Sequence, residues 1–258
     1  MNFLHKMRDI REKILNLILP LSVVLAILVL WIGLAVSVDN QYLLPSVSQT
    51  VNALYNLVGQ KEFYTALLGT LGRSVIAFVL SFGIGSVLGI ISLERRNAER
   101  IIQPVMALTR ALPTIAVVLL LLFWTTSKIA PIIVTALVVL PTSYTHVRSA
   151  FLSVDKTSVE AGMVDGANKR QIFTKIRLPQ AMPFVYNAIG SGLSLNLKLM
   201  VAAEVLSSTA NSIGYLLNTS KVYFEIAQML AIVMVMVVLG CIIETSFLSL
   251  SKKASSWR

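Results

Sequence analysis

The sequence has few of the residues on which soluble enzymes and disulfide-rich secreted proteins depend. Among its 258 residues are one cysteine, Cys241, and two histidines, His5 and His146, and only 13% of the residues are charged. One cysteine excludes an intramolecular disulfide, and two distant histidines exclude a Cys/His zinc cluster. No nucleophile–base pair can be placed and no Gly-x4-Gly-Lys-Ser/Thr pattern is present, so we expect this chain to be no enzyme and to bind no cofactor or ATP itself.

Apolar residues are abundant instead and make up 56% of the chain. A helix needs about 20 residues to cross roughly 30 Å of hydrocarbon, and only a helix satisfies its own backbone there. The long apolar windows predict an all-α, polytopic membrane helix bundle of about six transmembrane helices, forming a single domain over residues 1–258. The first window is too long for a signal-peptide core, so we expect it to be retained. The predicted spans are 15–36, 64–93, 104–124, 129–150, 184–206 and 226–250.

Basic residues are distributed unevenly over the loops between these spans. Most of the 22 Lys and Arg lie in the N-terminal segment, the 94–103 loop, the 148–183 segment and the C-terminal tail. Only Lys61, Lys128 and Lys221 lie in the alternate loops. Because positive charge stays on the cytoplasmic side, both termini are predicted to be cytoplasmic. The net charge of +10 is then explained by the membrane, and no nucleic-acid partner is expected.

The cytoplasmic loop 151–183 begins with a helix signal. Thr157 with Glu160 three residues later predicts a capping box that starts a short helix. Gly166 is placed to end that helix, because such an end usually needs a left-handed backbone.

A second short helix is predicted in the same loop. Asn168 with Gln171 can cap its start, and Pro179 is predicted to bound it. The loop therefore predicts a helix–glycine–helix knob held between two spans, suited to touching a partner in the cytosol.

The loop between the first two spans, residues 38–61, is longer than a simple connection requires. Its apolar residues recur at helical spacing and predict a short helix at the outer interface. Packing of the rim of the bundle and docking of an external partner both remain open. The apolar residues are Val51, Leu54, Tyr55, Leu57 and Val58.

Small residues four apart, Ser81, Gly85 and Gly89, form a ridge along the second span. Such a ridge allows close helix–helix contact. We expect it to pack within one subunit or across a dimer, and not to bind a ligand.

Charged residues inside the spans need partners or water, because each is costly at mid-membrane. Arg110 and Glu244 lie near the inner ends of their spans and predict an ion pair. Arg73 and Glu204 lie in the outer halves of theirs and predict a second pair that closes an outer gate. Glu204 is also a candidate for function.

A polar stripe runs along the fifth span, where residues four, three and four positions apart share one helix face. Such a stripe should face protein or a water-filled cavity. Two interpretations remain: Lys198 meets an anionic solute in a pathway, or its ammonium pairs with an acid such as Glu204. The stripe comprises Asn187, Ser191, Ser194 and Lys198.

The knob carries the pattern Glu160-Ala161-Gly162-x3-Gly166-x9-Ile176-x-Leu178-Pro179, which resembles the EAA loop of permease subunits in binding-protein-dependent ABC importers. Three further motifs resemble the nitrate/sulfonate/taurine branch of that family, so the likeness covers roughly residues 41–250. The chain departs from the branch at 119–126 and at Asn196 and Lys198, where substrate could pass. The three motifs are Leu44-Pro45-Ser46, Thr70-Leu71-x-Arg73-Ser74 and Ala202-Ala203-Glu204.

The resemblance implies a non-catalytic permease subunit, multi-pass in the bacterial cytoplasmic (inner) membrane lipid, that forms the pathway for a small organic anion. Its implied partners are a second permease copy, giving a homodimer, an extracytoplasmic substrate-binding protein, and two cytosolic ABC ATPase subunits that carry the ATP and Mg. The implied ATPase-coupling residues are Glu160, Ala161, Gly162, Asp165, Gly166, Ala167 and Pro179, and the candidate pathway residues are Asn187, Ser191, Ser194, Lys198 and Glu204.

Two other classes are weighed against this one. An ion-coupled secondary transporter predicts inverted repeats with broken helices in matched halves, and no such halves are apparent. A membrane-embedded enzyme predicts a catalytic constellation at membrane depth, which the candidate residues do not form. The requirement for an ATPase distinguishes the importer from both.

Overall fold

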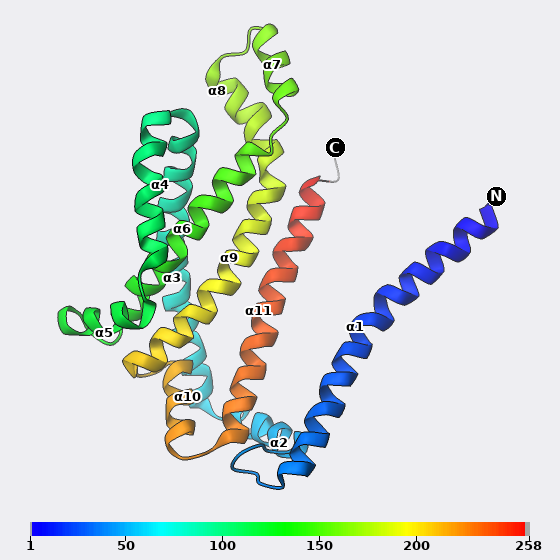
Figure 1. The fold of residues 1–258 in the computed structure, drawn as a ribbon, viewed down its shortest axis with the longest axis vertical. Helices are drawn as coiled ribbons and strands as arrows, with labels where there is room; N and C mark the ends of the chain where they lie inside the picture. The colour runs from blue at the N-terminus through cyan, green and yellow to red at the C-terminus, as the bar shows by residue number, and fades with distance from the viewer. Residues whose placement is uncertain (1, 256–258) are drawn as a thin grey trace. The chain divides into compact units, whose positions relative to one another are not determined.

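The computed structural model describes the backbone of residues 2–255, and the side chains of residues 18, 19 and 21–255. All regular structure in the described chain is helical (Figure 1). The basic residues of the N-terminal segment, from which a cytoplasmic N-terminus is predicted, lie outside the described side chains, and so does His5. The helices are α1 (Asn2–Val38), α2 (Val47–Val58), α3 (Lys61–Glu94), α4 (Arg96–Ala111), α5 (Thr114–Trp124), α6 (Ala130–Leu152), α7 (Lys156–Val164), α8 (Lys169–Ile172), the π-helical turn η1 (Phe173–Arg177), α9 (Leu178–Ser207), α10 (Ile213–Val222) and α11 (Ile226–Ser255).

Five of these helices are long and apolar enough to cross a membrane, and a bent pair raises the count to six. They are α1, α3, α6, the helical run Lys169–Ser207 that ends in α9, and α11. The predicted all-α bundle of about six spans is therefore confirmed. The chain forms two compact units: residues 1–59 with 220–231, and residues 60–219 with 232–258.

In the first unit, α1 leads into α2, the short helix predicted from the amphipathic stretch. Ser46 caps α2, because its hydroxyl accepts a hydrogen bond from the backbone amide of Gln49 at 3.2 Å. In return, the side-chain oxygen of Gln49 accepts from the backbone amide of Ser46, which completes a capping box. The Trp31 indole donates to the carbonyl of Pro45 at 3.0 Å, which ties the connecting loop to α1. The helix is confirmed, while its place at the outer interface stays a prediction.

In the second unit, α3, α6 and α9 lie side by side and form the core (Figure 1). The ridge of small residues makes this packing close. A Cβ added at Gly85 would lie 2.8 Å from the Cβ of Ser143, and one at Gly89 would lie 3.1 Å from the carbonyl of Tyr144. The ridge therefore packs α3 against α6 within one chain, which decides between the two expectations for it.

The third predicted span, 104–124, is wrong as a single helix. Two helices, α4 and α5, replace it, bent by 91°. Leu112 is extended at φ −65° and ψ 126°, because the residue before a proline is pushed out of the helical region. Pro113 then has no N–H with which to continue the ladder of α4.

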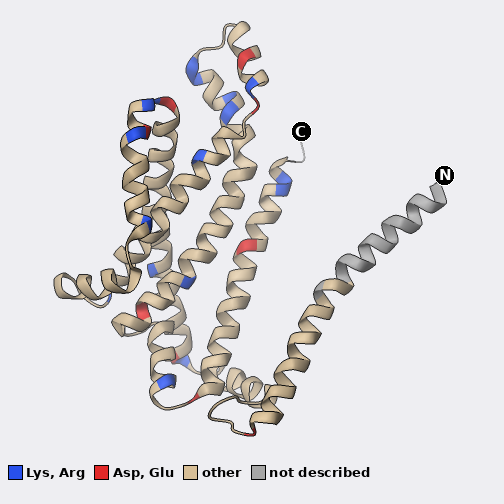
Figure 2. Cartoon of the chain, viewed as in Figure 1, with Lys and Arg blue, Asp and Glu red and all other residues tan. Residues whose placement is uncertain are grey.

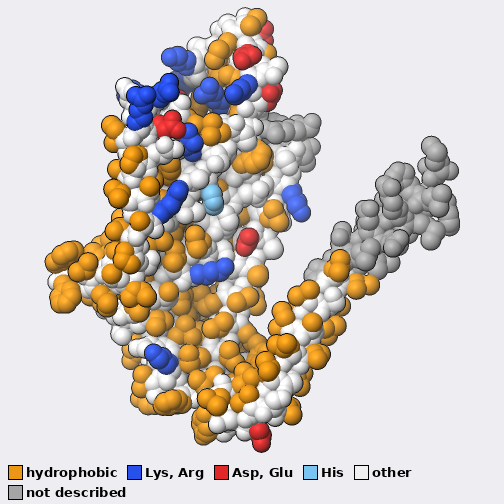
Figure 3. All heavy atoms as spheres, viewed as in Figure 1, with side chains coloured by type: hydrophobic (Ala, Val, Ile, Leu, Met, Phe, Trp, Pro, Cys, Tyr) orange, Lys and Arg blue, Asp and Glu red, His pale blue; other side chains and the backbone are white. Residues whose placement is uncertain are grey.

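Charged and hydrophobic side chains are concentrated in different parts of the second unit. Lys and Arg gather around α7, α8 and the turn between α3 and α4 (Figure 2). Hydrophobic side chains cover the part of this unit around α5 (Figure 3). One end of the unit is therefore basic and its middle apolar, as in a membrane protein whose basic end faces the cytoplasm.

Candidate functional site

The knob begins with α7, and an aspartate starts it. The Asp155 carboxylate accepts from the amides of Thr157 at 3.1 Å and Ser158 at 2.9 Å. The predicted capping box of Thr157 and Glu160 is wrong, because Asp155 already satisfies these orphan amides from two residues upstream. Hydrogen bonds from the Ser158 hydroxyl and amide, and from the Thr157 amide, hold the pKa of Asp155 below its usual value.

Gly166 ends α7 as predicted. Its φ of +78° is left-handed, a conformation that a side chain disfavours. The turn lets the amide of Ala167 reach the carbonyl of Gly162 at 3.0 Å. The predicted cap of the next helix is also confirmed, since Asn168 and Gln171 exchange side-chain and backbone hydrogen bonds, each 2.9 Å long.

Pro179 does not bound the second helix, contrary to the prediction. The chain runs from α8 through η1 into α9 without a break, and the amide of Leu178 bonds to the carbonyl of Phe173, five residues back. Pro179 lies in the first turn of α9, where its missing N–H leaves the helix intact. The knob is therefore a rigid extension of the fifth span.

The knob has its own apolar core. Val154, Val159, Ile172 and Ala181 are buried together, and Ile176 packs against them. A Cβ added at Gly162 would lie 2.6 Å from the Cδ1 of Ile176. Gly162 thus permits close approach within the knob itself.

The rest of the surface of α7 is exposed. Glu160 is exposed and makes no hydrogen bond or ion pair among the described residues. Val164 is 86% exposed at the tip beside Asp165, and Met163, 56% exposed, lines an open cavity together with Val159 and Glu160. A small surface of mixed apolar and acidic character is presented on a stiff support.

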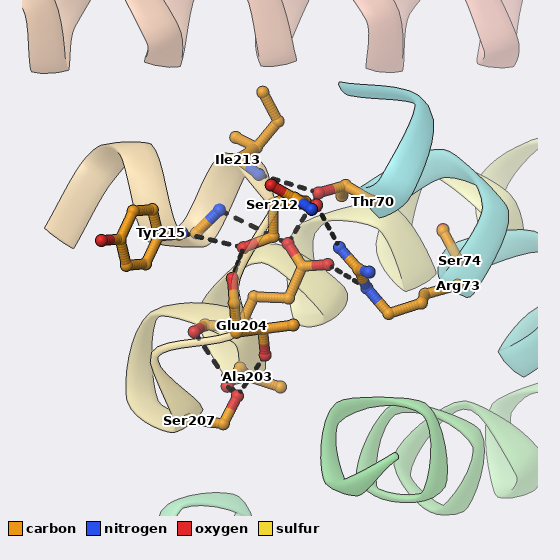
Figure 4. Close-up of polar contacts among 12 residues, drawn as sticks. Thr70, Arg73, Ser74, Ala203, Glu204, Ser207, Ser212, Ile213 and Tyr215 are labelled. Carbon is orange, nitrogen blue, oxygen red and sulfur yellow. Dashed lines mark hydrogen bonds and ion pairs between the residues drawn. The ribbon is translucent and has the colours of Figure 1, made fainter. Parts of the chain in front are cut away.

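A second polar cluster lies where α3, α9 and α10 meet (Figure 4). The fully buried carboxylate of Glu204 accepts from the Thr70 hydroxyl at 2.7 Å and from Arg73 Nε at 2.8 Å. The Thr70 hydroxyl in turn accepts from the amide of Ile213 at 2.9 Å, and Arg73 donates to the carbonyl of Asn211 at 3.0 Å. The predicted pairing of Arg73 with Glu204 is confirmed, and the pair also holds the segment that follows α9.

That segment, 208–212, is tightly folded onto the cluster. Ser208 and Asn211 have positive φ values of 47° and 53°. A Cβ added at Gly214 would lie 2.4 Å from the Cβ of Glu204, and one at Gly69 would lie 2.3 Å from the Asn211 carbonyl. Left-handed residues and close backbone contacts together fix one path for this turn.

The sequence interpretation missed Thr70 in this cluster. Thr70 and Arg73 are three residues apart on α3, and residues at that spacing share a helix face. A similar contact joins α9 to α3 further along, where the Asn196 amide donates to the Ser74 carbonyl at 2.8 Å and hydroxyl at 2.6 Å. A buried carboxylate in an apolar helix needs several donors, which was the available signal.

The residues of the polar stripe of α9 lie in three different environments. Asn187 and Ser191 line an open cavity. Ser194 is buried, and a Cβ added at Gly240 of α11 would lie 3.3 Å from its hydroxyl. Lys198 is exposed and makes no ion pair among the described residues, so its predicted alternative pairing with Glu204 is wrong.

The predicted ion pair between Arg110 and Glu244 is also wrong. Arg110 donates to the Pro141 carbonyl at 3.1 Å and to the Thr145 hydroxyl, both on α6. The Pro141 carbonyl also accepts from the Thr145 hydroxyl at 2.9 Å, and a guanidinium with five donors can serve both acceptors. Glu244 has no ion-pair or hydrogen-bond partner among the described residues.

The candidate spans, the basic end (Figure 2) and the packed helix–glycine–helix knob define a multi-pass helical membrane protein. Residues 81–255 match the family described as the binding-protein-dependent transport system inner membrane component. The chain belongs to this family, which confirms the resemblance drawn from the EAA pattern.

Individual relatives are distant. The taurine transport system permease protein TauC of Escherichia coli (strain K12) is 22% identical over 88% of this chain and 84% of its own length. The formylaminopyrimidine transport permease protein ThiX of Halalkalibacterium halodurans is 23% identical over 93% of this chain and 95% of its own length. A solved structure of a bacterial ABC transporter involved in the import of the acidic polysaccharide alginate has a TM-score of 0.64 at 18% identity, covering 98% of this chain and 100% of that one. The likeness to the solved structure shows a shared fold, and the two relatives to which the chain is similar are permease proteins of transport systems.

Proposed function

We propose that this ABC importer permease subunit forms the solute pathway and couples ATP hydrolysis, carried out with Mg on two partner ATPase subunits, to alternating access. The surface of the knob is the coupling surface. It comprises Glu160, Ala161, Met163, Val164 and Asp165.

One observation carries the proposal: the knob is packed against the fifth span on one side and exposes, on the other, side chains that are unpaired among the described residues. Its packed core and the unbroken helix from α8 through α9 tie it to the fifth span. Its outward side leaves Val164 86% exposed and Glu160 unpaired among the described residues. A partner that moved this surface would therefore move α9 with it.

The test is co-purification of the ATPase subunit from detergent-solubilised membranes. The coupling variant is Glu160→Lys with Val164→Asp, two exposed positions whose change leaves the core of the knob intact. The control is Arg96→Glu, an exposed charge reversal at the turn between α3 and α4. Wild type and control should retain the ATPase and the coupling variant should lose it; equal retention by all three would reject the coupling surface.

The solute is proposed to be a small organic anion that passes Lys198. An exposed ammonium without a partner among the described residues supports this, because a charge in a span should meet water or a ligand. Replacing Lys198→Met should abolish uptake of the anion while the ATPase still co-purifies, measured as ATP-dependent accumulation in vesicles. Unchanged uptake by this variant would remove Lys198 from the pathway.

The assembly is proposed to be a homodimer in the bacterial cytoplasmic membrane, with both termini in the cytoplasm and an extracytoplasmic binding protein delivering the solute. The solved alginate transporter was determined in complex with an alginate-bound periplasmic protein, which supports such a partner here. An ion-coupled secondary transporter is not favoured, since the family is that of binding-protein-dependent systems.

A further inference from the structure

A cavity of about 410 Å³ lies between α6, α9 and α11 within the second unit. Its lining combines polar and apolar side chains. Neither Lys nor Arg is among the lining residues, so Glu244 supplies the formal charge there. The lining residues that matter here are His146, Asn187, Ser191 and Glu244, with Phe184 and Leu248.

Glu244 lies on the face of α11 that packs against α9. A Cβ added at Gly190 of α9 would lie 2.7 Å from the Cβ of Phe247 and 3.5 Å from the Glu244 carbonyl. One turn further along α11, the Ser251 hydroxyl donates to the Pro183 carbonyl at 2.7 Å. These contacts fix which side of α11 meets α9, and the spacing of four, three and four residues from Gly240 to Ser251 puts Glu244 on that side.

The carboxylate of Glu244 therefore stands in the cavity without a partner. It makes no ion pair or hydrogen bond among the described residues, and Arg110 is occupied on α6. A carboxylate in a span is expected to face protein partners or water. With no partner present, this cavity suits a ligand group that brings positive charge.

We propose that this cavity is a cation-accepting subsite of the transport pathway and takes the protonated amine of a zwitterionic solute. The inference rests on the proposed function and refines its solute to one that carries an amine beside its anionic group. Lys198 lies seven residues beyond Ser191 on α9, roughly 10 Å along the helix axis. The two unpaired charges thus lie on neighbouring helices, Glu244 of α11 in the cavity and Lys198 further along α9, and a solute with groups of both signs meets attraction at each.

The experiment measures the charge preference of the cavity with a cysteine reporter in the complete importer. The reporter is Ser191→Cys in a Cys241→Ser background, because Cys241 is an exposed thiol on α11. It is reacted with a cationic methanethiosulfonate (trimethylammonium-ethyl) and an anionic one (sulfonato-ethyl). The rate ratio with 2-mercaptoethanol in solution gives the intrinsic preference of the reagents.

The cationic reagent should be favoured about tenfold or more beyond the intrinsic ratio, because a cleft lined by one sign of charge concentrates counter-ions. Glu244→Gln should remove that preference. A ratio equal to the intrinsic one, or one unchanged by Glu244→Gln, overturns the proposal. Ser149→Cys provides a second reporter in the same cavity, and absence of reaction at both overturns the water-filled subsite itself.

The solute class is tested by protection of the same reporter. Taurine, with an ammonium and a sulfonate, should slow the cationic reaction. Isethionate, which has a hydroxyl in place of the ammonium, should not; equal protection by both overturns the amine assignment. Co-purification of the ATPase is scored separately on the same preparations, so failure of the coupling proposal is distinguishable from failure of the subsite.

Discussion

Glu204 shows how a single ionised residue is accommodated in an apolar helix. Its two oxygens receive donors from α3, and Gly214 of α10 lies so close that an added Cβ would be 2.4 Å from the Glu204 Cβ. The carboxylate thereby joins three elements, and its partners are worth more together than one at a time. The sequence predicted the Arg73 pair, but the number of donors came from packing.

Removing one partner should be costly. Arg73→Met is expected to lower the free energy of unfolding by about 3–5 kcal/mol, because it leaves a buried carboxylate without its cation. Glu204→Gln added to Arg73→Met should recover part of this loss, since the amide carries no charge. Titration with SDS in mixed micelles measures both. Lys198→Met, at an exposed position on α9, the helix that carries Glu204, is the control and should leave the free energy of unfolding unchanged. An Arg73→Met protein as stable as the wild type would contradict the stabilising role of the Arg73–Glu204 pair.

Gly162 makes a prediction at the same scale. Gly162→Val should destabilise the knob by about 1–3 kcal/mol, the usual cost of overpacking a core. The contacting atom is the Cδ1 of Ile176, so adding Ile176→Val, which lacks that atom, should restore much of the stability. Proteolysis rates of the loop in detergent report the change. Ala161→Val, at the exposed neighbouring position, is the matched control, and equal effects at 161 and 162 would refute the packing argument.

At the scale of elements, prolines and caps decide where helices begin and end, and their effect depends on context. Pro113 separates α4 from α5, whereas Pro179 and Pro141 lie within continuous helices. The local backbone differs at Pro179, because the π-helical turn η1 precedes it and the amide of Leu178 bonds to the carbonyl of Phe173, five residues back. Pro179 was therefore wrongly predicted to bound a helix, whereas Pro113, which separates two helices, lies inside a predicted single span.

The cap of α7 should respond to pH. The pKa of Asp155 is lowered in the folded protein, so the cap contributes stability above the unfolded pKa of about 3.9 and loses it as pH falls through the folded pKa. Hydrogen exchange of the Thr157 and Ser158 amides should be steadily protected from about pH 5 to 7 and become less protected below about pH 4. Asp155→Asn should show no such transition. Asp165→Asn, at the other end of α7, should keep it, and loss of the transition there would contradict the assignment to Asp155.

At the scale of the whole molecule, the distribution of charge predicts the orientation of the protein in the membrane. Arginines and lysines gather around α7, α8 and the turn between α3 and α4 (Figure 2). This end must face the cytoplasm for the knob to reach an ATPase.

Cysteine labelling tests that orientation. In a Cys241→Ser background, Lys221→Cys should react with a membrane-impermeant maleimide in intact cells. Lys169→Cys in the knob should react only after the membrane is opened. Both positions are exposed, which makes them a matched pair. The reverse pattern would place the knob outside and reject the coupling proposal with it.

The helical class, the spans and the family could be predicted from residue patterns because each rests on local chemistry. Long apolar windows must become helices in lipid, and Gly166 and Asn168 carry their conformations within a few residues. The break in the third span and the first residue of α7 were predicted less accurately, because signals for different helix boundaries lay only one or two residues apart in the sequence. Leu112 with Pro113 outweighed the apolar run, and Asp155 outcompeted Thr157.

The sequence by itself therefore determined a multi-pass helical bundle, a helix–glycine–helix knob and a polar stripe, since periodicity and capping are properties of neighbouring residues. Only the tertiary structure decided how the charges are distributed among partners. Glu204 pairs with Arg73 and accepts a hydrogen bond from Thr70, and Arg110 donates to α6. Lys198 and Glu244 are unpaired among the described residues. Ion pairing depends on which helix faces meet across more than a hundred residues of chain, and that is fixed by close contacts such as Gly85 on Ser143 and Gly190 on Phe247.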